Sequence, residues 1–194
     1  SSKPTSEMRY GTKVEPLIFA CAKELYPDLI EVGYKAFDDF PTAGASSDAL
    51  IPGVATVEMK ACVSWGSHYK RTFERTDEKS IDFWQTMCQM KAHNLDKCYY
   101  IVAEPPKDMF KYLNYDGDII DLLDDFKKEC PISVETVDAS PFHINALFER
   151  IKICENAVNA WLADGGRIDD VFWDVVDGIS GVASVIVDVP KVDE

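Results

Sequence analysis

The sequence contains no long hydrophobic run. No segment approaches the roughly 18 uninterrupted apolar residues that a membrane-spanning helix needs. The first residues, S-S-K-P-T-S-E, also lack the apolar stretch that a secretory signal requires. We therefore expect a soluble protein in the cytoplasm, with no membrane partner.

Cysteine patterns of the metal-binding type are also missing. The six cysteines stand at positions 21, 62, 88, 98, 130 and 154, with no C-x-x-C pair and no histidine at zinc-finger spacing from any two of them. The four clustered cysteines of an iron–sulfur site are not found either. A chain of this length does not need bridges to fold, so we expect reduced, mostly buried thiols.

The chain also has no overall excess of positive charge. The net charge of −14 argues against nucleic-acid binding, because phosphates are repelled by a negative surface. Residues 58–79 differ, with five basic residues against four acidic ones, so the rest of the chain carries −15. Acidic residues that hold divalent cations would also reverse the local sign. The charge therefore leaves a nucleic-acid partner open.

The composition fits a single domain with its own core. The chain has 194 residues, of which 46% are hydrophobic, and it shows no internal repeat or low-complexity tract. We place the domain at residues 1–166. Residues 167–194 carry seven acidic and two basic residues around aromatic and aliphatic side chains. This extension either packs on the core or forms a surface for a partner.

Hydrophobic periodicity predicts helices and strands along the chain. Apolar residues recur at helical spacing in residues 14–25, 80–94 and 140–165. Residues 54–63 and 98–103 have the composition of strands, and two shorter strand-like runs lie between residues 30 and 40. This arrangement favours an α/β fold.

Three charged side chains combine around the strand at residues 54–63. Glu58 and Lys60 are two apart and therefore project from the same face, and Asp48 ends the turn before the strand. Two such carboxylates could chelate one or two Mg²⁺ ions, and the lysine could orient a water or stabilise a phosphorane. The same pattern also arises by chance in an edge strand with a solvated Glu and Lys face.

Further segments extend this pattern. Residues 8–16 read M-R-Y-G-T-K-V-E-P, residues 46–50 read S-S-D-A-L, and residues 57–60 read V-E-M-K. Residues 84–90 read W-Q-T-M-C-Q-M and are followed by C-Y-Y-I-V at 98–102. In this order the segments resemble four motifs of the lambda-exonuclease/YqaJ-like viral recombinase family. These are the helix start M-x-[WY]-G-x-x-x-E-P, the turn S-P-D-G-L, the strand (I/L)-E-(I/L)-K, and a glutamine-bearing helix with the strand after it. The resemblance implies a PD-(D/E)XK, restriction-endonuclease-like core, with a central mixed sheet flanked by helices.

The resemblance also assigns roles to the central residues. Asp48, Glu58 and the backbone carbonyl of Met59 would hold one or two Mg²⁺ or Mn²⁺ ions. Lys60 would be the catalytic lysine. The enzyme would then be a metal-dependent deoxyribonuclease.

Two outer residues match the family as well. Glu15 would reach the site from the first helix through a metal-bound water or a second metal, and Gln85 would face it from the later helix. The structural alternative for Glu15 is a carboxylate favoured by the dipole at a helix start. For Gln85 the alternative is an exposed helix position.

The resemblance implies an exonuclease that degrades linear DNA from 5′ to 3′ in phage-type recombination or replication, in a bacterial or phage-infected cell. Its partners would be DNA, a single-strand annealing protein and further copies of itself in a trimer. Ser47 and Ala49 depart from the proline and glycine of the family's turn. The family's upstream segment, with a serine and an arginine associated with the DNA 5′-phosphate, has no match here, which bears on end binding rather than on hydrolysis.

Two other functions fit the same fold. One is a Cas4-like or repair nuclease without an iron–sulfur cluster. The other is a catalytically silent relative that serves as a binding module. The intact set of Asp48, Glu58 and Lys60 argues against the silent module.

The polar stretch after the predicted catalytic strand combines cations with aromatic rings. Its members are His68, Lys70, Arg71 and Arg75, with Trp65 and Tyr69 among them. Such side chains grip phosphates and stack on bases, so we predict a DNA contact here. A surface loop without a ligand is the structural alternative.

Overall fold

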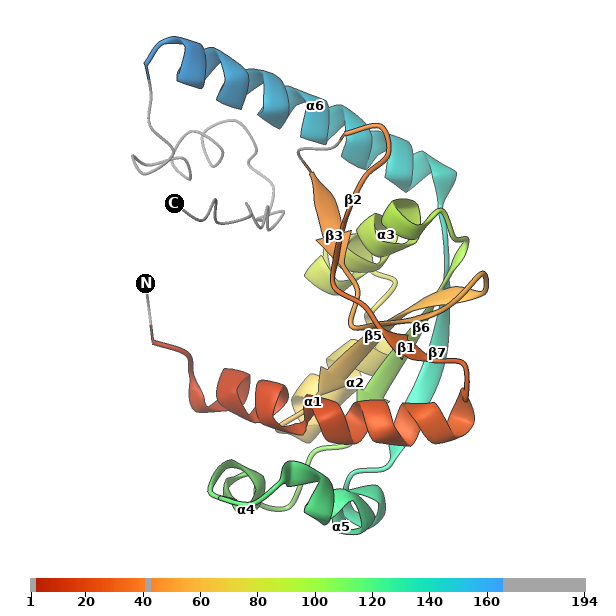
Figure 1. The fold of residues 1–194 in the computed structure, drawn as a ribbon, viewed down its shortest axis with the longest axis vertical. Coiled ribbons are helices and arrows are strands. Elements are labelled where there is room, and N and C mark those ends of the chain that lie inside the picture. Colours follow the sequence, from red (N-terminus) through yellow and green to blue (C-terminus); the bar gives the residue numbers. More distant parts are fainter. Residues whose placement is uncertain (1–2, 41–42, 166–194) are drawn as a thin grey trace.

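A mixed sheet of five strands forms the centre of the computed structural model, which describes residues 3–40 and 43–165 (Figure 1). The strand order is β1 (Ile30–Glu31), β4 (Ala49–Ile51), β5 (Ala55–Ala61), β6 (Lys97–Ala103) and β7 (Ile132–Asp138). Strands β5 and β6 run parallel, and the other neighbours are antiparallel. Strands β2 (Tyr34–Ala36) and β3 (Gly44–Ser46) form a separate antiparallel pair. The predicted extension at residues 167–194 lies outside the described residues.

The helices are α1 (Ser6–Leu25), α2 (Trp65–Phe73), α3 (Ile81–His93), α4 (Phe110–Leu113), α5 (Leu123–Glu129) and α6 (Pro141–Ala163), with a 3₁₀ turn η1 at Ile119–Leu122. Helices α2 and α3 make the crossover between β5 and β6 that a parallel pair requires. Within residues 3–40 and 43–165, no helix has the length and apolar character to cross a bilayer.

Helix α1 covers one face of the sheet. Its buried Val14, Leu17 and Ile18 share a core with Val57 and Met59 of β5. The helix begins at Ser6, earlier than the periodicity predicts, because Thr5 caps it by accepting a hydrogen bond from the backbone N–H of Met8.

Helix α3 covers the other face. Its Phe83, Met87 and Met90 pack against Cys98 and Tyr100 of β6. Successive strand residues point to opposite faces, so the side of β5 that carries residues 58 and 60 is turned to α3. A crossover helix therefore lies directly over the predicted catalytic pair.

Helix α6 runs along the end of the molecule beyond α3 and the β2–β3 pair (Figure 1). Its Leu147, Phe148 and Ile151 pack against Phe37 and Ala92. The six cysteines are all free, and four of them are buried, as the sequence predicts. The predicted mixed α/β architecture is confirmed.

Candidate active site

The carboxylate of Glu58 lies at the centre of the site. The side chain is 2% exposed, one oxygen contacts the Lys60 ammonium, and the other accepts a hydrogen bond from the Gln89 amide. Burial raises the pKa of Glu58, Lys60 opposes this rise, and the negative charge of Asp48 adds to it. A buried acid of this kind favours a proton or a cation beside it.

Asp48 stands directly before β4 and is held against β5. Its Oδ2 accepts a hydrogen bond of 2.6 Å from the backbone N–H of Met59. This contact continues the β4–β5 pairing, in which Ala49 faces Val57. Burial raises the pKa of Asp48, whereas the Met59 N–H and Lys60 lower it. Asp48 and Glu58 thus meet across two adjacent strands.

The ammonium of Lys60 is held by three neighbours. It contacts Glu58, donates a 3.0 Å hydrogen bond to Oε1 of Gln85, and lies 3.6 Å from Oδ1 of Asp82. Burial alone would lower the pKa of Lys60, but the carboxylates of Glu58 and Asp82 outweigh it and raise the pKa. Lys60 therefore carries its charge at neutral pH.

One face of α3 supplies the remaining contacts. Asp82, Gln85 and Gln89 are spaced three and four residues apart, which brings them to the same side of the helix. Asp82 accepts a 2.6 Å hydrogen bond from the Tyr100 hydroxyl and lies 3.7 Å from Arg71. Asp82 and Gln89 were not predicted. Their spacing from Gln85, one turn away in each direction, is the signal that could have indicated them.

Glu15 lies near this cluster without touching it. The side chain is exposed on α1, and it makes no hydrogen bond or ion pair with any described residue. Burial raises the pKa of Glu15, and the negative charges of Glu58 and Glu31 add to the rise. The structure therefore brings Glu15 into electrostatic reach of the site. Glu58, Lys60 and Gln85 are linked by direct contacts, and Asp48 bonds to the Met59 N–H between Glu58 and Lys60.

The donors suit a divalent cation bound through oxygen. Among residues 3–40 and 43–165, no three His, Cys, Asp or Glu side chains are grouped closely enough to hold a metal by themselves. Asp48 and Glu58 would supply two carboxylates, with the Met59 carbonyl and water completing the shell that Mg²⁺ prefers. The pKa values of both carboxyl groups are raised, so a cation between them would relieve an unfavourable burial of charge.

Three of the predicted DNA-binding residues, His68, Lys70 and Arg71, lie on helix α2, and Arg75 lies in the turn after it. Lys70 is exposed, whereas the two arginines are paired with carboxylates. Arg71 faces Asp82, and Nη2 of Arg75 donates a 3.0 Å hydrogen bond to Glu135 of β7. The ring of His68 is packed edge-on against Trp65, with centroids 5.4 Å apart. The predicted set therefore consists of one exposed cation, Lys70, and two arginines that are already paired, one on α2 and one in the turn after it.

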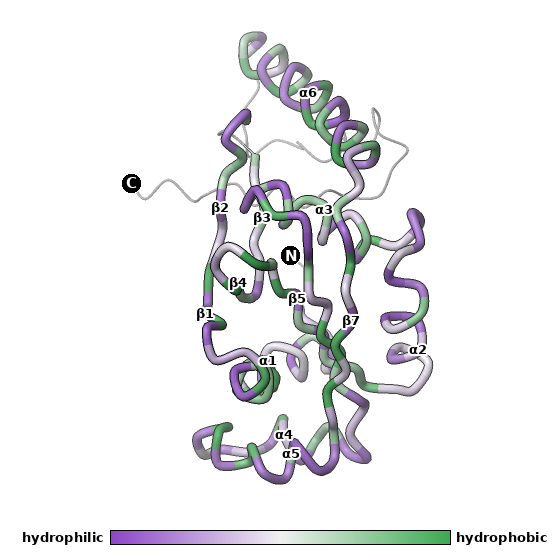
Figure 2. The backbone as a smooth tube through the Cα atoms, turned by 90° about the vertical axis from the view of Figure 1, so that its right-hand side faces the viewer, coloured by the Kyte–Doolittle hydropathy of each residue, from purple (hydrophilic) through white to green (hydrophobic). Residues whose placement is uncertain are grey.

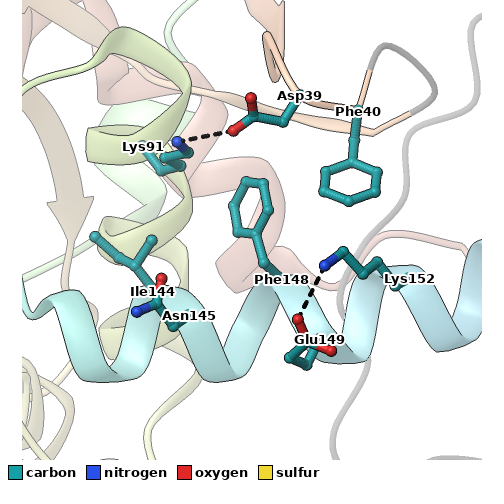
Figure 3. A pocket seen from close by; sticks show the side chains of 8 residues that line it. All are labelled: Asp39, Phe40, Lys91, Ile144, Asn145, Phe148, Glu149 and Lys152. Carbon is teal, nitrogen blue, oxygen red and sulfur yellow. Dashed lines mark hydrogen bonds and ion pairs between the residues drawn. The ribbon is translucent and has the colours of Figure 1, made fainter.

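A separate pocket of about 320 Å³ lies between α3, α6 and the loop after β2 (Figure 3). Its two lysines face carboxylates, Lys91 towards Asp39 at 3.1 Å and Lys152 towards Glu149 at 2.9 Å. None of the predicted catalytic residues lines it. The chemistry of the candidate site is therefore at the sheet and α3, not in this pocket.

Comparison with known proteins finds relatives by structure alone. No protein-family model matches the chain, and no curated protein matches it in sequence. The alkaline exonuclease LHK-Exo from Laribacter hongkongensis has a TM-score of 0.51 at 20% identity, over 84% of this chain and 71% of that one. The same protein in complex with dAMP matches with a TM-score of 0.51 at 22% identity, over 84% and 70%.

A phage-related exonuclease from Haemophilus somnus 129PT matches as well. Its TM-score is 0.53 at 18% identity, over 78% of this chain and 68% of the other. At identities of 18–22%, these TM-scores show a common fold. The chain therefore shares its fold with an alkaline exonuclease and a phage-related exonuclease, in agreement with the fold expected from its resemblance to the lambda-exonuclease/YqaJ-like family.

Proposed function

We propose that this protein is a metal-dependent deoxyribonuclease that degrades linear DNA from an end. The observation that carries the proposal is the contact cluster at the sheet. A charged lysine, Lys60, lies against the buried carboxylate of Glu58, and Asp48 joins them from the next strand. The fold shared with exonucleases supports this assignment, and so does the dAMP bound by LHK-Exo, since a deoxynucleoside monophosphate is what end-wise hydrolysis of DNA releases.

Asp48, Glu58 and the carbonyl of Met59 are the proposed ligands of Mg²⁺ or Mn²⁺. One or two such ions, when bound, would supply positive charge that activates water and stabilises the phosphorane. Asp48 lies directly before β4 and Glu58 lies on β5, and the pairing of these two strands sets the spacing of the ligands. Glu15, exposed on α1 and within electrostatic reach of Glu58, would bond to a metal-bound water or a second metal, as the family resemblance implies.

Lys60 would act on the reacting phosphate itself. An ammonium has three N–H donors, and Gln85 and Asp82 orient it from α3. Of the three contacts of the Lys60 ammonium, the one with Glu58 could be replaced by a contact with an attacking water or a phosphoryl oxygen. Held in this way, the ammonium would stabilise charge that develops in the transition state without reorganising first.

The finer features follow from the family resemblance and are part of the proposal. They are cleavage from 5′ to 3′, a role in phage-type recombination or replication, a trimer, and an annealing protein that receives the remaining strand. Direct contacts around Lys60 make a catalytically silent module the less favoured function, because such a module has no need for a buried, oriented ammonium.

The test is digestion of end-labelled linear duplex DNA and of closed circular DNA, with Mg²⁺ and with EDTA. Loss of the linear DNA alone, in Mg²⁺ alone, is expected, and release of the 5′ or 3′ label gives the direction. A Lys97→Ala variant is the control, because Lys97 is a half-exposed strand lysine paired with Asp138. Undiminished cleavage in excess EDTA, or equal loss of circular DNA, would contradict the proposal.

A further inference from the structure

Helix α2 carries an exposed aromatic stripe, formed by Trp65, Tyr69 and Phe73. These side chains are 63%, 58% and 65% exposed, and their four-residue spacing aligns them along one side of the helix. The rings of Tyr69 and Phe73 are 4.8 Å apart, inclined at 40°. Of the five most exposed large hydrophobic side chains in the described part of the chain, three lie on this helix.

The stripe is not part of the core. Helix α2 stands along the side of the molecule (Figure 2), and Thr72, buried at 8% exposure, marks the side that faces the sheet. Large aromatic surface left in water has a free-energy cost, and an exposed apolar patch of this kind is typical of a binding surface. A partner that covers the rings is therefore expected.

The charge beside the stripe favours an anionic partner. Helix α2 contains no acidic residue, and the first acid after it is its C-cap, Glu74. The side chain of Lys70 is exposed and makes no hydrogen bond or ion pair with any residue in the described ranges. The protein as a whole has a net charge of −14, so a helix with exposed rings, an exposed lysine and no acidic residue differs in charge from the rest of the chain.

The inner side of α2 provides a second, independent observation. Seven buried side-chain polar atoms have no hydrogen-bond partner within the described ranges, and four belong to α2 or the turn after it. The four are His68 Nε2, Arg71 Nη1, Thr72 Oγ1 and Arg75 Nε. Buried polar groups without partners are rare in native proteins, and each calls for a bound water, an ion or a functional role. Three of the four are nitrogen atoms, and one of these, Arg71 Nη1, lies 3.7 Å from Asp82.

Helix α2 is also tied to the candidate active site. Only residues 61–64 separate Lys60 from Trp65, a span of at most about 18 Å. Arg71 on the inner side lies 3.7 Å from Asp82, which lies 3.6 Å from Lys60. A DNA strand engaged at Lys60 would therefore pass within reach of the stripe.

We propose that α2 is a stacking site for unpaired bases of the DNA strand that enters the active site. The rings of Trp65, Tyr69 and Phe73 would contact base faces, and Lys70 would contact phosphate. Base faces are accessible only where the strand is unpaired, since a duplex presents base edges and backbone. The choice of DNA as the ligand rests on the proposed nuclease function. The three rings are expected to contribute to the binding of unpaired DNA and not to that of a blunt duplex.

The test is fluorescence anisotropy in EDTA, so that no cleavage occurs, with labelled oligothymidylate and a blunt duplex of equal length. Trp65→Ala and Tyr69→Ala should each weaken binding of the single strand by about fivefold or more, the effect of losing one stacked base. Binding of the duplex should change by less than about twofold, because stacking needs an open base face. Trp65→Phe and Tyr69→Phe keep a ring and should retain most of the affinity.

Two further variants separate stacking from charge and from general surface effects. Lys70→Ala should weaken binding of both DNAs and reduce the salt dependence for the single strand by about 0.7 in log–log slope. Phe142→Ala is the matched control, because Phe142 is an aromatic residue of α6 that is 77% exposed. It should leave both affinities unchanged.

Several results would overturn the stacking site. They are no binding of the single strand, equal weakening of both DNAs by the alanine variants, or parental affinity in all of them. Dissociation of a multimer by Trp65→Ala in sedimentation, with DNA affinity intact, would instead make the stripe an interface between copies. Because the assay needs no cleavage, ring-dependent binding by a protein that cleaves no DNA in Mg²⁺ or Mn²⁺ would refute the nuclease function alone and leave the stacking site intact.

Discussion

Replacement of Lys60 by alanine removes the cation from a cluster of three carboxylates. The ammonium contacts Glu58, lies 3.6 Å from Asp82, and lowers the pKa of Asp48. The side chains of Lys60 and Glu58 are 16% and 2% exposed, so solvent screens the charge of Glu58 only weakly. In the metal-free protein, Lys60→Ala therefore leaves a buried charge uncompensated.

Lys60→Ala should therefore lower the free energy of unfolding of the metal-free protein. Removal of one partner from a buried ion pair destabilises a protein by about 3–5 kcal/mol. Glu58 can avoid part of this cost by taking up a proton, because its pKa is already raised by burial, so we expect about 3 kcal/mol. For a chain of this size each kcal/mol lowers Tm by about 2–4 °C, which gives a fall of about 6–12 °C.

Mn²⁺ should reverse the loss. A divalent ion beside Asp48 and Glu58 supplies the missing positive charge, so the rise in Tm on adding Mn²⁺ should be larger for Lys60→Ala than for the parent. The affinity for Mn²⁺ should persist or increase, since a competing cation is gone. The cleavage rate should nevertheless fall by about a hundredfold or more, the effect of losing one preorganised donor.

Differential scanning calorimetry with and without Mn²⁺, calorimetric titration of Mn²⁺ and single-turnover cleavage measure these three quantities. Lys97→Ala is again the control and should behave as the parent in all of them. Cleavage at the parental rate by Lys60→Ala would show that the lysine has no catalytic role. A metal-free Tm equal to that of the parent would show that the buried pair is not formed.

Three further predictions concern the carboxylates and the metal. Asp48→Ala and Glu58→Ala should each abolish tight Mn²⁺ binding in calorimetric titration and cleavage in a gel assay; retention of both would exclude that residue as a ligand. Mg²⁺ and Mn²⁺ should support cleavage while Ca²⁺ binds without efficient turnover, which metal exchange in the gel assay would check. Burial raises the pKa of Glu58 from its ordinary 4.5 to about 7, so the folded state binds more protons than the unfolded state between these values. The metal-free protein should then lose stability as pH rises through this window. Urea denaturation at several pH values should show this loss for the parent and not for Glu58→Gln, which cannot titrate. Identical pH profiles for the two proteins would refute the assigned shift.

The catalytic strand could be predicted from the sequence because its pattern is local. Alternation along a strand places Glu58 and Lys60 on one face, and the structure confirms this by linking both to α3. The position of Gln85 came from the family resemblance, and its contact with Lys60 agrees with it. Asp82 and Gln89 lie on the same helical face but were not predicted, because the family pattern marks only one glutamine on this helix.

Helix α2 shows what local patterns do not reveal. The carboxylates that pair with Arg71 and Arg75 come from α3 and β7, so nothing near the arginines in sequence indicates that they face inward. The helix itself was not predicted, because its apolar stripe is exposed and therefore does not mark a core-facing side. Strand β7 was missed for a related reason, since Val137 is its only fully buried residue.

The most direct test of the central claim is anomalous diffraction from crystals of the protein soaked in Mn²⁺. An Mn²⁺ peak is expected beside the carboxylates of Asp48 and Glu58 and the backbone carbonyl of Met59, with Lys60 still bonded to Gln85. A peak at another site with these carboxylates unliganded, or none at saturating Mn²⁺, would contradict it.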